Sequence, residues 1–414
     1  MISMYRPALV LFPRLLGIKL WPVWLGESDY PAVLGLIGSH VKEVSIQWNL
    51  DDDPERHLQT CISLISARFS SVEDFDLYCS KGPRVCKIIH ASLIDRLRSL
   101  RNFRSNKLPI SRDALGALGR LQNLSAMNIH LPAFLETPPL DSGSFPALGE
   151  IEITALTMDY FAFADAVGTL PRVERADIVL RDAPKPEDGL RFFDSICTKF
   201  SHTKLTQLSV STSEDAHSLR ETPPALITHP HLRRLFGFTA LIGLTVNLAC
   251  SYALDGDLCL EIAKAFPEME VLHIGDSKVC RYDYPTITVP PMSKVLCPFA
   301  THCRELISLG IPFDARESFS IQDVKDALPY SPSRSQLYSL HCSHSPIEDG
   351  QLVAAYLARV FPALANGYDI WWCEFGRSYL GREWESEWEE VRRLVPWFKM
   401  IRDDEANLSE DSEG

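Results

Sequence analysis

The stretch LIGLTVNLACSYALDGDLCLEIAKAFPEMEVLHI (Leu241–Ile274) holds one complete structural unit and the start of the next. It begins and ends with the same six-residue phrase, in which apolar residues occupy the first, fourth and sixth positions. Apolar residues at every second position predict a strand with one buried face. Between the two phrases, Asp257–Phe266 has the three- and four-residue apolar spacing of a helix. A strand followed by a helix is therefore the unit to search for elsewhere.

The phrase occurs twelve times between the N-terminus and residue 342. The copies begin at Leu15, Val41, Val72, Leu97, Leu124, Leu148, Val173, Leu205, Leu241, Met269, Leu306 and Leu337. Their mean spacing is about 29 residues, at the long end of the leucine-rich-repeat range. Helical spacing also occurs in Arg56–Phe69 and Glu348–Phe361. These features predict an α/β fold, an irregular leucine-rich-repeat solenoid (horseshoe) with a parallel inner sheet and outer helices.

The fifth position of the phrase predicts an exposed surface. It was not used to align the copies, yet it is polar or glycine in every one, although 46% of the chain is apolar. In chain order the residues are Lys19, Ser45, Asp76, Arg101, Asn128, Glu152, Asp177, Ser209, Thr245, His273, Gly310 and His341. We expect them to form a column on the concave face of the sheet. The predicted partner-binding residues on this face are Asp74, Asp76, Glu150, Glu152, Asp177, His273 and His341. The first five form an acidic middle that would attract a basic partner.

Three parts are predicted along the chain. Residues 1–375 form the solenoid, with about 12 or 13 repeats, residues 376–402 a capping helix, and residues 403–414 a disordered acidic tail. The helix carries an apolar stripe of Trp384, Trp388, Val391, Leu394 and Val395. Such a stripe favours a helix that closes the end of the core. The alternative is an aromatic docking surface, because tryptophan is enriched at interfaces.

Composition excludes several classes of function. With 54 acidic and 41 basic residues the net charge is −13, which disfavours a nucleic-acid partner. No run of apolar residues is long enough to span a membrane, and the five-residue run ALVLF near the N-terminus is too short for a secretory signal. We therefore expect no membrane partner and an intracellular location, cytoplasmic or nuclear. The odd number of scattered cysteines, 11 in all, favours reduced thiols.

The residues that could carry chemistry have simpler interpretations. Two groups resemble metal ligands, Cys297, His302 and Cys303 in one and His341, Cys342 and His344 in the other. They contain no paired CxxC, Cys303 opens a strand phrase and Cys342 occupies an apolar position, so we expect buried thiols and no metal. Acidic residues at 51–53 and 255–257 fit helix starts. No phosphate-binding loop, GxSxG or HExxH is present, so we expect no cofactor and no enzymatic activity.

Four segments resemble a known protein group. They are PALVLFPRLLGIKLWP (Pro7–Pro22), the segment Leu244–Gly275, the segment Leu337–Leu364, and EWEEVRRLVPWF (Glu387–Phe398). Together they resemble the leucine-rich-repeat region of the F-box-like proteins of mushroom-forming fungi. The resemblance implies repeats that present a substrate to a ubiquitin ligase, with an N-terminal F-box docking on a Skp-type adaptor. No Leu-Pro-x-Glu phrase typical of an F-box precedes Leu15. We therefore expect a ubiquitin-ligase adaptor as a partner only if an F-box precedes Met1 in the complete gene.

The leading hypothesis is a non-enzymatic protein–protein interaction scaffold that resembles the substrate-recognition repeats of an F-box-type receptor. An alternative is a leucine-rich-repeat regulator of another enzyme, either GTPase-activator-like or inhibitor-like, with no ubiquitin link. A GTPase activator would present an arginine from a loop. The candidate arginines are Arg84, Arg112 and Arg181. A third possibility is a hydrolase in the long interval between Met269 and Leu306.

Overall fold

The computed structural model describes residues 11–21, 29–48, 54–79, 89, 91–132, 140–141, 143–213, 225–277, 289–316, 335–343, 345–364, 370–372 and 382–412. The chain divides into two compact units. The first comprises Met1–Arg181 with Thr198–Leu205, and the second Asp182–Cys197 with Thr206–Gly414. Arg84, His344 and the acidic residues 51–53 lie outside the described residues.

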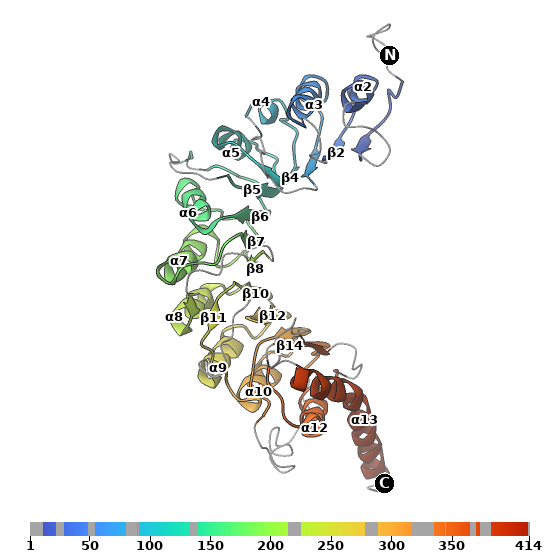
Figure 1. Ribbon diagram of the computed structural model, residues 1–414, viewed down its shortest axis with the longest axis vertical. Helices are drawn as coiled ribbons and strands as arrows, with labels where there is room; N and C mark the ends of the chain where they lie inside the picture. The colour runs from blue at the N-terminus through green and yellow to red at the C-terminus, as the bar shows by residue number, and fades with distance from the viewer. Residues whose placement is uncertain are drawn as a thin grey trace. The chain divides into compact units, whose positions relative to one another are not determined.

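The described part of the first unit contains parallel strands that pair in chain order. They are β1 (Gly17–Leu20), β2 (Glu43–Trp48), β3 (Asp74–Cys79), β4 (Asn102–Pro109), β5 (Ala126–His130), β6 (Glu150–Ala155) and β7 (Arg175–Leu180). The helices between them are α2 (Tyr30–Gly35), α3 (Pro54–Arg68), α4 (Ala91–Ile94), α5 (Arg112–Gly119) and α6 (Thr157–Ala166). Within this unit the helices lie on one side of the strands (Figure 1). None of the described helices of this unit covers the other face of the sheet.

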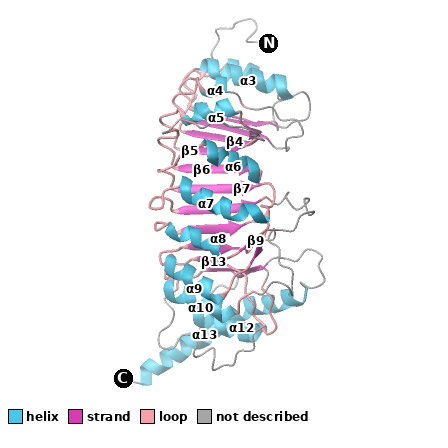
Figure 2. Ribbon diagram, turned by 90° about the vertical axis from the view of Figure 1, so that its left-hand side faces the viewer, coloured by secondary structure: helices cyan, strands magenta, loops and turns pink. Residues whose placement is uncertain are grey.

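The second unit repeats this arrangement. Its main strands are β8 (Gln207–Thr212), β10 (Gly243–Asn247), β12 (Val271–Ile274), β13 (Ser308–Gly310), β14 (Ser339–Ser343) and β15 (Ile370–Trp372). A small second sheet pairs β9 (Leu226–Ile227) with β11 (Ser251–Tyr252). The helical elements are η2 (Pro186–Asp188), α7 (Gly189–Lys199), α8 (His229–Arg233), η4 (Arg234–Gly237), α9 (Gly256–Ala265), α10 (Met292–His302), α12 (Gly350–Val360) and α13 (Arg382–Ser412). Figure 2 shows the strands of each unit lying side by side, with helices on the side toward the viewer.

The apolar positions of the phrase build the core. Val41, Val44 and Ile46 are each at most 1% exposed, and most of the equivalent residues of the other described copies are buried as well. The start of α9 is fixed locally, because the Asp255 carboxylate accepts a 2.8 Å hydrogen bond from the Leu258 amide. The predicted fold class, a leucine-rich-repeat solenoid with a parallel sheet and outer helices, is thus confirmed in each unit.

One position of the predicted column is wrong. Asp76 of β3 is in register with Arg104 of β4, and Arg104 is in register with Asn128. Arg101 instead precedes β4 and forms an ion pair with Glu73 at 3.4 Å. The fourth phrase therefore begins at residue 100, three residues later than its apolar spacing suggests. Its sixth position is Ser105, a fully buried serine whose hydroxyl donates to the Leu108 carbonyl, so the usual apolar signal is absent there.

Strand β15 adds a repeat that the phrase does not reveal. Leu340 of β14 pairs with Ile370, and His341 pairs with Trp371. In this copy the first position, which is apolar in the other copies, is Gly367. The fifth position, which is polar or glycine in the other copies, is Trp371. Trp371 is 55% exposed and stacks on His341, with ring centroids 6.3 Å apart.

Helix α13 packs against α12. Trp388, Val391 and Val395 are buried, and the Gly350 amide at the start of α12 donates to the Glu387 carboxylate at 3.0 Å. The capping role of residues 376–402 stays a prediction. The helix begins at Arg382 and continues to Ser412, so it includes residues 403–412 of the segment expected to be a disordered tail. That segment contains glutamate, alanine and leucine, which favour helix.

Candidate functional site

The five predicted acidic residues share one face of the first unit. Asp74 and Asp76 alternate with the buried Phe75 and Leu77 on β3, and Glu150 and Glu152 alternate with buried residues on β6. Asp177 on β7 is in register with Glu152. Because side chains alternate between the two faces of a strand, all five project from the side opposite the core and the helices.

The charge of this face is mixed rather than uniformly acidic. Arg104 stands between Asp76 and Asn128 in the column, and Arg175 forms an ion pair with Glu150 at 3.5 Å. The five predicted carboxylates and Glu43 of β2 therefore share this face with Arg104, Arg175 and Lys19 of β1, and the excess remains negative. These arginines make the predicted acidic middle less negative than expected. Arg104 was not predicted on this face, because the sequence pattern placed the fourth phrase three residues too early.

Two half-buried carboxylates lie side by side on β6 and β7. Burial, together with the charge of Asp177, raises the pKa of Glu152, against a hydrogen bond from Asn128 and the charge of Arg104. On β3, Asp76 accepts a 3.3 Å hydrogen bond from Ser45 through Oδ2. Its Oδ1 is shielded from solvent and accepts no hydrogen bond from any described residue. The face thus holds carboxylates in fixed positions with acceptor capacity left over.

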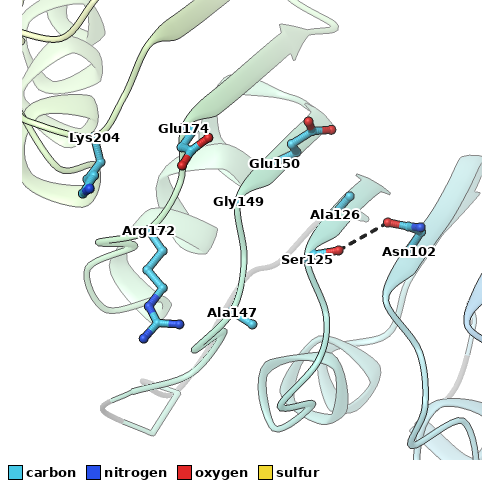
Figure 3. Close-up of a pocket in the computed structure, with 9 residues that line it drawn as sticks. All are labelled: Asn102, Ser125, Ala126, Ala147, Gly149, Glu150, Arg172, Glu174 and Lys204. Carbon is cyan, nitrogen blue, oxygen red and sulfur yellow. Dashed lines mark hydrogen bonds between the residues drawn. The ribbon is translucent and has the colours of Figure 1, made fainter.

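A cavity of about 580 Å³ lies at the start of the strands beside this column. Small residues at the starts of β5 and β6 leave the space, and charged side chains border it (Figure 3). The lining residues are Asn102, Ser125, Ala126, Ala147, Gly149, Glu150, Arg172, Glu174 and Lys204. Glu150 belongs to both the cavity and the acidic face, so the two are continuous. The repeated phrase does not predict the cavity, because most of the residues that line the cavity lie just before the strands.

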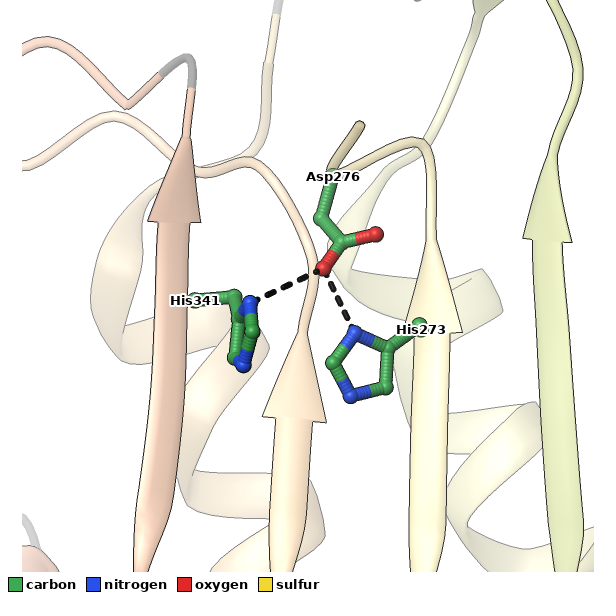
Figure 4. Close-up of side chains that lie close together, drawn as sticks. All are labelled: His273, Asp276 and His341. Atoms are coloured by element: carbon green, nitrogen blue, oxygen red, sulfur yellow. Dashed lines mark hydrogen bonds and ion pairs between the residues drawn. The ribbon is translucent and has the colours of Figure 1, made fainter. Parts of the chain in front are cut away.

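In the second unit three side chains converge on one point. His273 on β12 and His341 on β14 flank Asp276, which lies in the turn after β12 (Figure 4). The Asp276 Oδ2 atom lies 2.6 Å from His273 Nδ1 and 3.6 Å from His341 Nδ1. The two imidazole rings are edge to face, with centroids 4.6 Å apart. The sequence places both histidines on this face but does not reveal Asp276.

A glycine in the intervening strand makes this convergence possible. His273, Gly310 and His341 are in register across β12, β13 and β14. A Cβ atom at residue 310 would lie 2.0 Å from Asp276 Oδ2 and 2.5 Å from His273 Nδ1. Gly275, with φ of 69°, turns the chain so that Asp276 lies over the gap. The glycine in the predicted column was the sequence signal for this cluster.

The cluster holds a carboxylate between two imidazoles. Burial acts to raise the pKa of Asp276, but the hydrogen bond and charge of His273, with Asn247 and His341, outweigh it and leave this pKa below its ordinary value. Burial and the charge of His273 lower the pKa of His341, against the attraction of Asp276. At neutral pH the cluster therefore presents an anionic carboxylate beside a neutral His341 ring.

The predicted Cys/His groups do not supply metal ligands in the same way. Cys303 and Cys342 are buried, as expected, and burial raises the pKa of the Cys303 thiol to about 12. The Cys303 sulfur lies 3.4 Å from the Phe266 carbonyl, to which it donates. Cys297 contacts the Tyr356 hydroxyl at 2.9 Å. Of the described residues in these two groups, only His341 enters the cluster with His273 and Asp276.

Of the three candidate arginines, the structure describes Arg112 and Arg181, and both take part in the local structure around them. Arg112 begins α5 and is half-buried. Arg181 follows β7 and pairs with the buried Asp159 at 3.7 Å, with 30% of its side chain exposed. An arginine that acts on a bound nucleotide has to reach beyond its own unit. The ion pair with Asp159 directs Arg181 toward its own unit instead.

His130 at the end of β5 should make the protein acid-sensitive. Burial, and to a lesser extent the charge of Arg181, lowers its pKa from 6.5 to about 4. Because the folded-state pKa is depressed, the stability due to neutral His130 is fully present above pH 6.5 and is lost as the pH falls toward 4. The loss in the free energy of unfolding is about 3 kcal/mol.

Urea unfolding between pH 6.5 and 4 tests this expectation. The free energy of unfolding should depend less steeply on pH in His130→Gln than in the wild type. The same slope in both proteins would contradict the assignment, and His202→Gln, at an exposed histidine, serves as the control.

No family model and no curated protein matches the chain. Among solved structures it is similar to a chain in the crystal structure of the TLR13–ssRNA13 complex, with a TM-score of 0.39 and 13% sequence identity. The match covers 86% of this chain and 50% of that chain, so this chain spans about half the length of its structural neighbour. Among the described helices, none is both long enough and apolar enough to cross a membrane.

Proposed function

We propose that the chain is a protein–protein interaction scaffold and that the open face of the sheet binds its partner. The observation that carries the proposal is the ordered column Asp76–Arg104–Asn128–Glu152–Asp177 on five adjacent strands. Parallel strands lie about 4.8 Å apart, so the column extends over roughly 19 Å. An extended, open surface of this width suits a folded partner or a peptide, because small-molecule sites are usually enclosed.

The surface of the partner that binds the open face should carry basic side chains. The excess of carboxylates around the column attracts positive charge and speeds association. A lysine or arginine supplies charged N–H donors to exposed carboxylates of this face, such as that of Glu150. The cavity beside Glu150 offers space for a side chain that projects from the partner. These features support a basic segment that crosses the strands of the first unit.

The more specific role remains part of the proposal. The resemblance of four segments to the repeats of F-box-like proteins suggests that the bound partner is a substrate for ubiquitin transfer. Co-purification with a Skp-type adaptor would support that role, and its absence would leave the scaffold without a ubiquitin link. The chain is proposed to act inside the cell, in the cytoplasm or nucleus.

Neutralising the two neighbouring carboxylates tests the proposed surface. The double variant Glu152→Gln/Asp177→Asn should fold as stably as the wild type or better, because burial and, second to it, repulsion from Asp177 disfavour the charge on Glu152 and raise its pKa. It should nevertheless retain several-fold less partner in affinity capture from cells that express the chain. The matched control Asp95→Asn/Asp113→Asn makes the same charge change at exposed residues of the helical side. Equal capture by both double variants would refute the proposal.

A further inference from the structure

We propose that His273, Asp276 and His341 bind one divalent first-row transition-metal ion, with zinc as the reference ion. One ligand atom from each of the three residues lies within 4.8 Å of the others. Two imidazole nitrogens and a carboxylate oxygen form a donor set that suits zinc or ferrous iron. The inference is independent of the protein partner proposed for the first unit, because it concerns a separate cluster of the second unit.

The distances suit an ion after a small adjustment. In a tetrahedral site with bonds near 2.1 Å, ligand atoms lie roughly 3.4 Å apart. Asp276 Oδ2 is 2.6 Å from His273 Nδ1, a hydrogen-bond distance, and 3.6 Å from His341 Nδ1. An ion would replace the proton shared by Asp276 and His273 and separate those two atoms by less than about 1 Å.

The surrounding residues already orient the three ligands. Asn247 donates to Asp276 Oδ1 at 2.6 Å, which leaves Oδ2 directed toward the histidines. His273 Nε2 lies 2.9 Å from the Ser308 hydroxyl, so the ring is held with Nδ1 facing Asp276. Partners of this kind orient the ligands of metal sites and raise their affinity. Trp371 stacks on the His341 ring from β15.

Gly310 allows the three ligands to come together. It contributes no side chain between the two histidines, and the Asp276 carboxylate occupies the position that a Cβ atom there would take. His341 is 32% exposed, whereas Asp276 is 5% exposed. The site is therefore buried on the carboxylate side and accessible on the histidine side. That access leaves room for a water molecule as a fourth ligand, as in zinc sites with three protein ligands.

Cobalt titration of the full chain tests the site. The reduced, chelator-treated protein should bind one Co²⁺ and show the visible bands of a tetrahedral nitrogen–oxygen site, without the near-ultraviolet band of a thiolate ligand. Zinc should displace the cobalt. His341→Asn should weaken binding more than about 100-fold, and Asn247→Ala by about 10- to 100-fold. His202→Ala, at an exposed histidine of the first unit, should bind as the wild type does.

Two further results decide whether this cluster is the site. Zinc should raise the thermal unfolding midpoint of the wild type but not that of His341→Asn, since only the folded wild type holds the three ligands together. His341→Asn keeps a polar side chain and should fold, as circular dichroism can verify. The proposal is overturned if no stoichiometric cobalt binds, if the bound cobalt shows thiolate ligation, or if His341→Asn binds it equally well.

Discussion

Trp388→Ala is expected to lower the free energy of unfolding by about 4 kcal/mol, because it removes a large side chain that is 1% exposed. The indole packs edge to face against Phe313, with centroids 6.0 Å apart, and its Nε1–H donates to the Ser345 carbonyl at 2.9 Å. The substitution leaves a cavity and also an unsatisfied buried carbonyl, and both effects destabilise the fold. Urea unfolding followed by far-ultraviolet circular dichroism measures the change.

The same helix provides a matched control for this prediction. Trp397 also lies on α13 but is 58% exposed, so Trp397→Ala should change the free energy of unfolding by less than about 0.5 kcal/mol. If Trp388→Ala does not fold, Trp388→Phe still loses the Ser345 hydrogen bond and should be clearly less stable than the wild type. Equal stability of the variants at 388 and 397 would contradict a capping role for α13.

Phe103→Ala is the second change with a large expected effect, about 4 kcal/mol of stability. Phe103 is fully buried at the fourth position of the corrected phrase and stacks on Phe75 of the neighbouring strand, with centroids 6.1 Å apart. The sequence pattern alone places the fourth phrase at residues 97–102, so that residue 103 follows it and is not a core position. The register of the strands places the phrase at residues 100–105, so that Phe103 is a core position. The two alignments therefore give opposite expectations for the loss of stability in Phe103→Ala. Urea unfolding of the variant distinguishes them.

Arg101 gives the complementary measurement. Its side chain is 64% exposed and pairs with Glu73 at the surface, so Arg101→Ala should cost less than about 0.5 kcal/mol. Phe103→Leu serves as a milder variant that keeps most of the apolar volume. A Phe103→Ala variant as stable as Arg101→Ala would show that the fourth repeat is wrongly aligned.

The repeat pattern predicts this fold well because one physical rule acts at every repeat. A strand with one buried face needs apolar residues at alternate positions, as in Val44 and Ile46, so the buried residues can be read from the sequence. The rule fails where another interaction replaces apolar packing. Ser105 can be buried because its hydroxyl is bonded to a carbonyl, and Trp371 occupies an exposed position where it stacks on His341.

The candidate sites are predicted less completely, because their geometry depends on register and turns. The sequence indicates that His273 and His341 share a face, but their approach depends on Gly310 in the strand between them. Asp276 reaches them only through the turn at Gly275. Likewise, Arg104 enters the acidic face only after the alignment of its repeat is corrected. Residue type and spacing alone do not contain these details.

The most direct test of the central claim is a site-specific photo-crosslink from the open face. A benzophenone amino acid at Glu150, which is exposed beside the column and the cavity, should form one reproducible protein adduct in cells that express the chain. The adduct should weaken in the Glu152→Gln/Asp177→Asn background. The same probe at Asp113, on α5 of the helical side, should not form it. An adduct that forms equally from Asp113, or that is unaffected by the two neutralised carboxylates, would contradict partner binding by the open face.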